Sequence, residues 1–178
     1  MKKIGIVFLV FVLVVLVWLL KNASKVEENP TSSSEESVIS AEELEDVFSL
    51  DIQSPFDLEK LKSYHLPIVI DFGADWCPPC KQMKPNYQKL YQTYRGKAII
   101  QYADVDEYPE LAEIFPMQYI PTQTFFNKDG TPYAPQNAKE LGLDFYYDHD
   151  KNHVLTMHVG GLSFEQMEQM LKEMGLDG

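Results

Sequence analysis

The chain has 178 residues, enough for one domain with a substantial core and some additional segments. Its formal net charge of −12 argues against nucleic acid as a partner, because phosphate binding needs a basic surface. The only two cysteines, Cys77 and Cys80, stand three residues apart. A loop that short constrains the unfolded chain very little, so the pair is not a disulfide framework.

The amino terminus carries a long apolar run. Lys2 and Lys3 precede a stretch without charge or proline that begins at Ile4 and ends at Leu20. Its 17 residues exceed the apolar region of a secretory signal, about 7 to 15 residues, and reach the short end of a membrane-spanning helix. We therefore expect residues 4–20 to be an uncleaved transmembrane anchor, with residues 1–3 in the cytoplasm because of the lysines. A cleaved export signal is the alternative.

Residues 21–43 differ in composition from the rest of the chain. They are rich in serine and glutamate, contain Pro30 and have few apolar side chains. This composition is typical of a flexible, solvated linker, here an acidic one. The folded domain is then expected over residues 44–178, outside the cytoplasm and tethered to the cell membrane of a bacterium by a single span.

A strand, a short helix and a second strand are expected first in this domain. Residues 47–50, Val-Phe-Ser-Leu, are mostly apolar, which predicts a strand. Ser54, followed by a proline, is typical of an N-cap and predicts a helix through Tyr64. Residues 67–72 are an apolar, β-branched run that predicts the central strand. Asp71 lies within that run, so burial should raise its pKa.

Both cysteines stand where this strand passes into a helix. The apolar residues that follow recur at helical spacing: Met83, Tyr87, Leu90, Tyr91 and Tyr94. With Cys77 as the N-cap, Pro78 and Pro79 take the first two helical positions, where a missing N–H costs no hydrogen bond, and Cys80 is third. The positive end of the helix dipole favours a thiolate at Cys77. One sulfur can then attack a disulfide and its neighbour can resolve the product.

The remaining pattern alternates strands and helices before a final hairpin. A buried strand is expected over 98–105, a helix over 109–115 and a strand over 122–127. Residues 127–130, Asn-Lys-Asp-Gly, are typical of a turn, and Ser163 begins a capping box for a last helix. This order predicts an α/β domain whose mixed sheet is covered on both faces.

No metal site is predicted. The four histidines, His65, His149, His153 and His158, show no paired spacing with the cysteines, and a structural zinc site needs four ligands. Residues 148–152 begin like a calcium-binding loop, but His153 stands where such a loop needs glycine. We interpret these residues as a turn.

Residues 71–85 resemble the active-site stretch of the thioredoxin family. Asp71 stands six residues before Cys77, as the family's buried acid does. Other positions agree as well: Trp76 before the first cysteine, Lys81 after the second, Pro85 five residues beyond Cys80, and Gly160 near the last strand. Ile120-Pro121-Thr122 is similar to the cis-proline loop that binds a substrate's extended backbone in this family. The resemblance covers residues 44–178.

The resemblance implies a thioredoxin fold, a redox-active disulfide between Cys77 and Cys80, and Asp71 as the proton acceptor for Cys80. It assigns substrate binding to Trp76, Ile120, Pro121 and Thr122. A purely structural role for Asp71 and simple packing of Trp76 are the alternatives.

Two positions depart from the family pattern. Gly73 stands where the family has tryptophan, and Tyr102 stands where it has a lysine near the buried acid. The Pro78–Pro79 dipeptide between the cysteines leaves the direction of electron flow open.

Residues 131–152 make the chain about twenty residues longer than a minimal thioredoxin. The segment contains four aromatic residues: Tyr133, Phe145, Tyr146 and Tyr147. We expect it to lengthen the final hairpin around a turn at 149–152. Packing of the hairpin is the favoured role of the aromatics, and partner recognition is the alternative.

The favoured function is an extracytoplasmic thiol:disulfide oxidoreductase that reduces disulfides of exported proteins by Cys77 attack and Cys80 resolution. Expected clients are apocytochrome c, other exported cysteine proteins, or a peroxide or sulfoxide reductase. No cofactor is expected, and a transmembrane thiol carrier of the DsbD type is the expected electron donor. A thiol oxidase with the same residues and a redox-silent binding module are the alternatives.

Overall fold

The computed structural model describes residues 41–52 and 54–176, which belong to one compact unit, Ile39–Gly178. The expected anchor at 4–20 and residues 21–40 of the expected linker lie outside the described residues. Within the described part, no helix is both long enough and apolar enough to cross a membrane.

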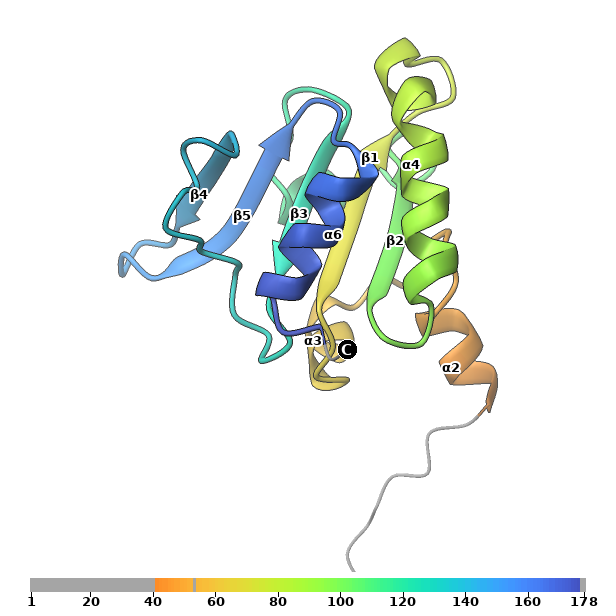
Figure 1. Ribbon diagram of the computed structural model, residues 1–178, viewed down its shortest axis with the longest axis horizontal. Coiled ribbons are helices and arrows are strands. Elements are labelled where there is room, and N and C mark those ends of the chain that lie inside the picture. The colour runs from red at the N-terminus through yellow and green to blue at the C-terminus, as the bar shows by residue number, and fades with distance from the viewer. Residues whose placement is uncertain (1–40, 53, 177–178) are drawn as a thin grey trace, which may run out of the picture. The chain divides into compact units, whose positions relative to one another are not determined.

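The core of the domain is a five-stranded sheet in the order β2-β1-β3-β5-β4 (Figure 1). β1 pairs parallel with β2, and the other neighbours are antiparallel. The strands are β1 Ile68–Gly73, β2 Ile99–Asp104, β3 Thr122–Phe126, β4 Leu143–Tyr147 and β5 His153–Val159. The predicted mixed sheet is therefore confirmed.

Helices cover both faces of the sheet. They are α2 Ala41–Val47, α3 Leu58–Ser63, α4 Pro78–Tyr94, α5 Leu111–Ile114 and α6 Phe164–Glu173. Helices α4 and α6 lie on one face (Figure 1), where they form a core with Val69 and Phe125. Residues of α2, α3 and α5 pack with Ile68 and Phe72 in a second core. All six residues of β1 are buried, which is why that strand is a nearly continuous apolar run.

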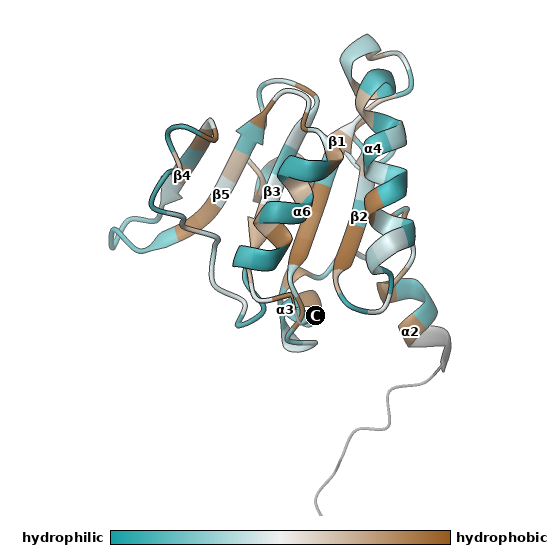
Figure 2. Ribbon diagram, in the orientation of Figure 1, coloured by the Kyte–Doolittle hydropathy of each residue, from teal (hydrophilic) through white to brown (hydrophobic). Residues whose placement is uncertain are grey.

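Hydropathy follows this layering. Strands β1 and β2 are largely hydrophobic, whereas the outward surfaces of α4 and α6 are mostly hydrophilic (Figure 2). Helix α6 begins with a capping box, in which the Ser163 hydroxyl accepts from the backbone N–H of Gln166 and the Gln166 side chain accepts from the N–H of Ser163. Helix α6 is followed by Gly175 at φ 99°, a conformation that favours glycine.

The predicted strand at 47–50 is wrong. Val47 is the last residue of α2 and is buried, and the backbone that follows forms an isolated bridge with β2, between Asp51 and Tyr102. A stretch of four residues, three of them apolar, is too short to distinguish a strand from the end of a helix.

The predicted start of the next helix is also wrong. Asp57 is the N-cap of α3 and accepts a hydrogen bond from Lys60 N at 3.0 Å, whereas Ser54 precedes a cis peptide bond to Pro55. Aspartate caps a helix as well as serine does, so sequence alone offers two candidates here. The helix expected over 109–115 is shorter, Leu111–Ile114.

The extra segment lengthens the final hairpin, as expected. Strands β4 and β5 are joined by a turn in which the Asp148 carboxylate accepts from the backbone N–H and the side-chain amide of Asn152, at 2.8 and 2.9 Å. Residues 148–152, which begin like a calcium-binding loop, therefore form a turn that is stabilised by hydrogen bonds between Asp148 and Asn152. The segment's aromatics differ in exposure: Tyr133 is buried in the core, whereas Tyr147 is exposed.

Candidate active site

The two cysteines form a disulfide at the start of α4. Cys77 is the N-cap, and its sulfur accepts from the backbone N–H of Cys80 at 3.2 Å, while Pro78 and Pro79 occupy the first helical positions. This arrangement is the predicted one. The helix continues through Pro85 to Tyr94, so the sulfur of Cys77 lies at the positive end of a long helix dipole. That position stabilises a thiolate once the disulfide is reduced.

The loop before β3 lies against the disulfide. The Ile120–Pro121 peptide bond is cis, and the Ile120 carbonyl oxygen lies 3.7 Å from the Cys77 sulfur. Gly160 N donates to the Pro121 carbonyl at 2.8 Å, which fastens the loop to the end of β5. Thr122 is buried and its hydroxyl donates to the Tyr119 carbonyl at 2.6 Å, so its side chain stabilises the loop from inside.

Trp76 stands on the surface beside the first cysteine. Its side chain is 64 % exposed, which argues against simple packing. The indole Nε1–H donates to Asp106 Oδ2 at 2.6 Å, and this bond fixes the ring across the loop that follows β2. Sequence reasoning missed Asp106, because the two residues are 30 positions apart and no local pattern joins them.

Asp71 is buried in β1 behind the cysteines. Burial raises its pKa from 3.8 to about 7, and the hydrogen bond that its Oδ1 accepts from Gln123 Nε2, at 2.8 Å, opposes that rise. The direction predicted from the apolar strand is therefore confirmed. A carboxyl group with a pKa near 7 exchanges its proton readily around neutral pH.

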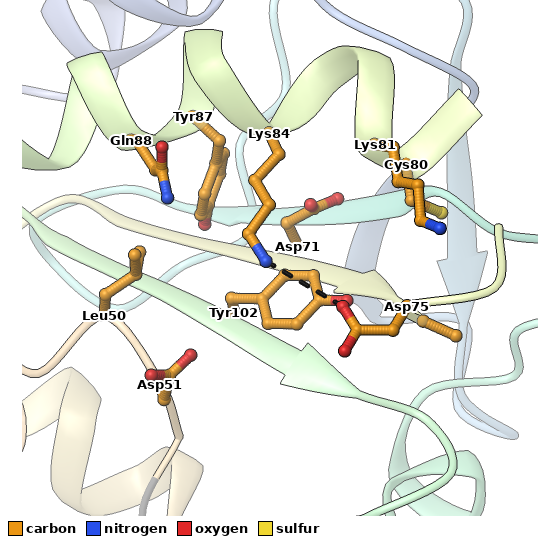
Figure 3. A pocket seen from close by; sticks show the side chains of 11 residues that line it. Leu50, Asp51, Asp71, Asp75, Cys80, Lys81, Lys84, Tyr87, Gln88 and Tyr102 are labelled. Atoms are coloured by element: carbon orange, nitrogen blue, oxygen red, sulfur yellow. Dashed lines mark ion pairs between the residues drawn. The ribbon is translucent and has the colours of Figure 1, made fainter. Parts of the chain in front are cut away.

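A pocket of about 30 Å³ connects the acid with the second cysteine. Asp71 and Cys80 both line it, together with Tyr102, Asp75 and Lys84 (Figure 3). The space is sufficient for a water molecule, which can carry a proton between the carboxyl group and the sulfur. The predicted site residues Cys77, Cys80 and Asp71 are thus brought together at one end of the sheet.

Lys84 is a further pocket residue that the sequence did not single out. Its Nζ lies 3.9 Å from Asp75 Oδ1 and 5.9 Å from the centroid of the Tyr102 ring (Figure 3). Lys84 lies in the second turn of α4, and its side chain extends from the helix toward the sheet, so that its ammonium group lies at the pocket. In the part of the chain with described coordinates, no group of three potential metal ligands lies close enough to bind an ion.

Comparison with known proteins decides the family. The thioredoxin family model matches residues 50–142, more than half of the chain. The chain belongs to the thioredoxin family. It is 38 % identical to thioredoxin 1 of Chlorobaculum tepidum over 66 residues, which are 37 % of this chain and 65 % of that protein. It is 40 % identical to an H-type thioredoxin of Chlamydomonas reinhardtii over 86 residues, 47 % of this chain and 75 % of that protein.

Other thioredoxins match over similar lengths. A thioredoxin of Staphylococcus aureus is 45 % identical over 64 residues, 36 % of this chain and 61 % of that protein. The matches to these three relatives therefore span between 61 % and 75 % of the relatives' length. Among solved structures, the Malassezia sympodialis thioredoxin superposes with a TM-score of 0.46 at 22 % identity, covering 71 % of this chain and 92 % of that one.

Proposed function

We propose that this thioredoxin-family protein is a thiol–disulfide oxidoreductase that reduces disulfides of partner proteins. The observation that carries the proposal is the placement of Cys77: it caps α4, and its sulfur lies 3.7 Å from the cis-proline loop. A partner's extended backbone bound to that loop would present its disulfide to the sulfur most stabilised as a thiolate.

The reaction proceeds in two exchange steps. The Cys77 thiolate attacks one sulfur of the partner's disulfide, forms a mixed disulfide and releases the partner's other sulfur as a thiolate. Cys80 then loses its proton to Asp71 through the shared pocket and attacks the Cys77 sulfur. This second step releases the partner's remaining thiolate and forms the Cys77–Cys80 disulfide, so that two electrons pass to the partner.

We also propose that the domain works outside the cytoplasm, tethered by residues 4–20. The apolar run and the two lysines before it support this location.

Soluble thioredoxin reductase does not act outside the membrane, so a transmembrane thiol carrier of the DsbD type would re-reduce the disulfide. Exported proteins with cysteine pairs are the corresponding clients. A fusion reporter at Gly178 tests the location, and activity of a cytoplasm-specific reporter would contradict it.

Trapping tests the reaction. The variant Cys80→Ser keeps the attacking sulfur and lacks the resolving one, so it should accumulate mixed disulfides that a reductant releases on a non-reducing gel. Cys77→Ser is the matched control and should trap far less, because Cys80 is third in the helix and faces the pocket. Equal trapping by both variants, or by neither, would contradict the assigned roles.

The reduction potential tests the direction. Equilibration against a defined thiol buffer should give a value near the thioredoxin range, about −270 mV. A value near about −120 mV would instead indicate a thiol oxidase that uses the same residues.

A further inference from the structure

Gln123 lies between a buried acid and a histidine in one row across three strands. In the register of the sheet, Asp71 of β1 pairs with Gln123 of β3, and Gln123 pairs with His158 of β5. Gln123 Nε2 donates to Asp71 Oδ1 at 2.8 Å, and Gln123 Oε1 lies 2.9 Å from His158 Nδ1. The glutamine side chain is fully buried, so these two neighbours are its main polar contacts.

The chemistry of an amide makes this row directional. Because Oε1 can only accept, His158 must carry a hydrogen on Nδ1 in this arrangement. The amide then presents its NH₂ group to Asp71, which suits an ionised carboxylate. A protonated Asp71 that donates its proton to Gln123 needs the reversed amide, whose NH₂ group faces His158. In that arrangement His158 Nδ1 must accept, which a cationic imidazole cannot do.

We propose that His158 and Gln123 are positioning residues for Asp71. The protonation state of His158 sets the orientation of the Gln123 amide, and that orientation sets which protonation state of Asp71 is favoured. A cationic His158 holds the orientation that favours the Asp71 carboxylate. A neutral His158 permits both orientations and therefore a protonated Asp71. Since such coupling is reciprocal, an ionised Asp71 also favours the proton on His158.

Burial shifts the pKa of both groups. The pKa of Asp71 is raised to about 7 by burial, and the pKa of half-buried His158 is lowered by burial, with a hydrogen bond to the Gly160 backbone and the charge of Asp144 on β4 opposing that change. The other groups around Asp71 are the Cys80 sulfur and the side chains of Tyr87, Lys81 and Lys84 on α4, Tyr102 on β2, Asp51, and Asp75 in the loop after β1. The Gln123 amide also contacts Met83 Sδ, at 3.5 Å from its Nε2.

The consequence for catalysis rests on the proposed exchange reaction. Cys80 needs an ionised Asp71 to take its proton before the second step. Because the Nδ1–H of His158 holds the Gln123 amide in the orientation that favours the Asp71 carboxylate, the resolving step should lose its rate at a higher pH in His158→Leu than in the unsubstituted protein.

A double-mutant cycle on the His158 titration tests the proposal. The oxidised full-length protein, labelled with ¹³C-histidine and kept in mild detergent, has only four histidines to assign. Asp71→Asn, whose amide N–H can donate as a protonated acid would, should increase the acid dissociation constant of His158 about threefold to tenfold. In the Gln123→Leu background, Asp71→Asn should increase the acid dissociation constant of His158 by less than about half of that factor.

A direct electrostatic attraction between the Asp71 carboxylate and a cationic His158 does not need the Gln123 amide. If that attraction were the cause, Asp71→Asn would have the same effect on His158 in the Gln123→Leu background as in the unsubstituted protein. An undiminished effect of Asp71→Asn with Leu at position 123 would therefore overturn the proposal. The measurement uses the oxidised protein without turnover. A negative result would therefore not contradict the proposed exchange reaction, and a protein without exchange activity could still show the coupling between His158 and Asp71.

A second measurement covers the case in which Gln123→Leu does not fold. The Asp71 carboxyl carbon is titrated in His158→Leu, where Asp71 should hold its proton to a higher pH. The matched control is His153→Leu, a partly buried histidine of the same strand that bonds Thr156 and Leu155 instead of Gln123. Identical Asp71 titrations in the two variants would overturn the proposal.

Discussion

The ring of Tyr102 occupies the space that a side chain at residue 73 would need. A Cβ atom at Gly73 would lie 2.9 Å from Tyr102 Cε2, closer than real Cβ atoms approach other groups, and 3.0 Å from the Tyr102 hydroxyl oxygen. Both positions depart from the thioredoxin pattern, with glycine in place of tryptophan and tyrosine in place of lysine. The two departures are therefore one change in packing beside Asp71, with Tyr102 forming a wall of the pocket.

Gly73→Ala tests this relationship. Alanine normally stabilises a strand relative to glycine, by about 0.5 to 1 kcal/mol. Here it should instead lower the free energy of unfolding by about 1 to 2 kcal/mol, because the strand is fully buried and the ring must move. In a Tyr102→Ala background the same substitution should be neutral or stabilising. Urea unfolding of the four proteins measures the cycle, and additive effects would show that the ring does not occupy this space.

The parts of the site that were predicted depend on signals close together in the sequence. The cap at Cys77, the prolines after it and the burial of Asp71 all follow from a strand running directly into a helix. The family resemblance added the cis peptide bond before Pro121, which no local pattern indicates.

The parts that were missed depend on register and on long-range contacts. Gln123 meets Asp71 and His158 only because three strands align at one row, and the sequence does not give that alignment. The bond from Trp76 to Asp106 likewise joins two loops at the end of the sheet. Val47 was misassigned because a four-residue, mostly apolar stretch is too short to show the periodicity that separates strand from helix.

Asp71→Asn should change the pH dependence of stability in the oxidised protein. Because the folded-state pKa, about 7, exceeds the ordinary value of 3.8, the folded protein binds more protons than the unfolded one between these values. The contribution of the Asp71 carboxyl group to the free energy of unfolding is therefore complete below about pH 4 and is lost as the pH rises through 7. At about 1.4 kcal/mol per pKa unit, the loss is about 4 kcal/mol.

The asparagine variant removes that loss. It should be more stable than the unsubstituted protein at pH 8 by up to about 4 kcal/mol and similar to it at pH 4. Urea unfolding at the two pH values makes the comparison. An equal effect of the substitution at both pH values would mean that the pKa of Asp71 is not raised in the folded protein.

Asp106→Ala should weaken reactions with protein partners while leaving the fold intact. The bond to Trp76 fixes an exposed ring beside Cys77, and its loss should cost about 1 kcal/mol in binding, or about fivefold in kcat/KM for a protein disulfide. Reduction of a small aromatic disulfide should be unchanged, and stability should change by less than about 0.5 kcal/mol. Glu107→Ala is the matched control, because Glu107 is exposed in the same loop, whereas the Trp76 bond goes to Asp106. Equal losses for both variants would contradict a specific role of the bond.

Tyr133 and Tyr147 separate packing from recognition in the extra segment. The Tyr133 side chain is 3 % exposed, packs against Phe125 with ring centroids 6.4 Å apart and donates to Glu173 Oε2 at 2.5 Å. Tyr133→Ala should therefore lower the free energy of unfolding by about 3 kcal/mol, as other aromatic-to-alanine changes in cores do. Tyr133→Phe, which keeps the ring, should cost about 1 kcal/mol through the lost hydrogen bond.

Tyr147 is 59 % exposed on β4, so Tyr147→Ala should change stability by less than about 1 kcal/mol. The two alanine variants are compared by their urea midpoints at unchanged denaturant slope. If Tyr147 takes part in recognition, its variant alone should lose activity toward a protein disulfide at normal stability. Because Tyr133 belongs to the core and β4 to the sheet, deletion of residues 131–152 would remove packing together with any recognition surface. Single substitutions at the two tyrosines are the discriminating test: a large stability loss at Tyr147 would assign it to packing as well.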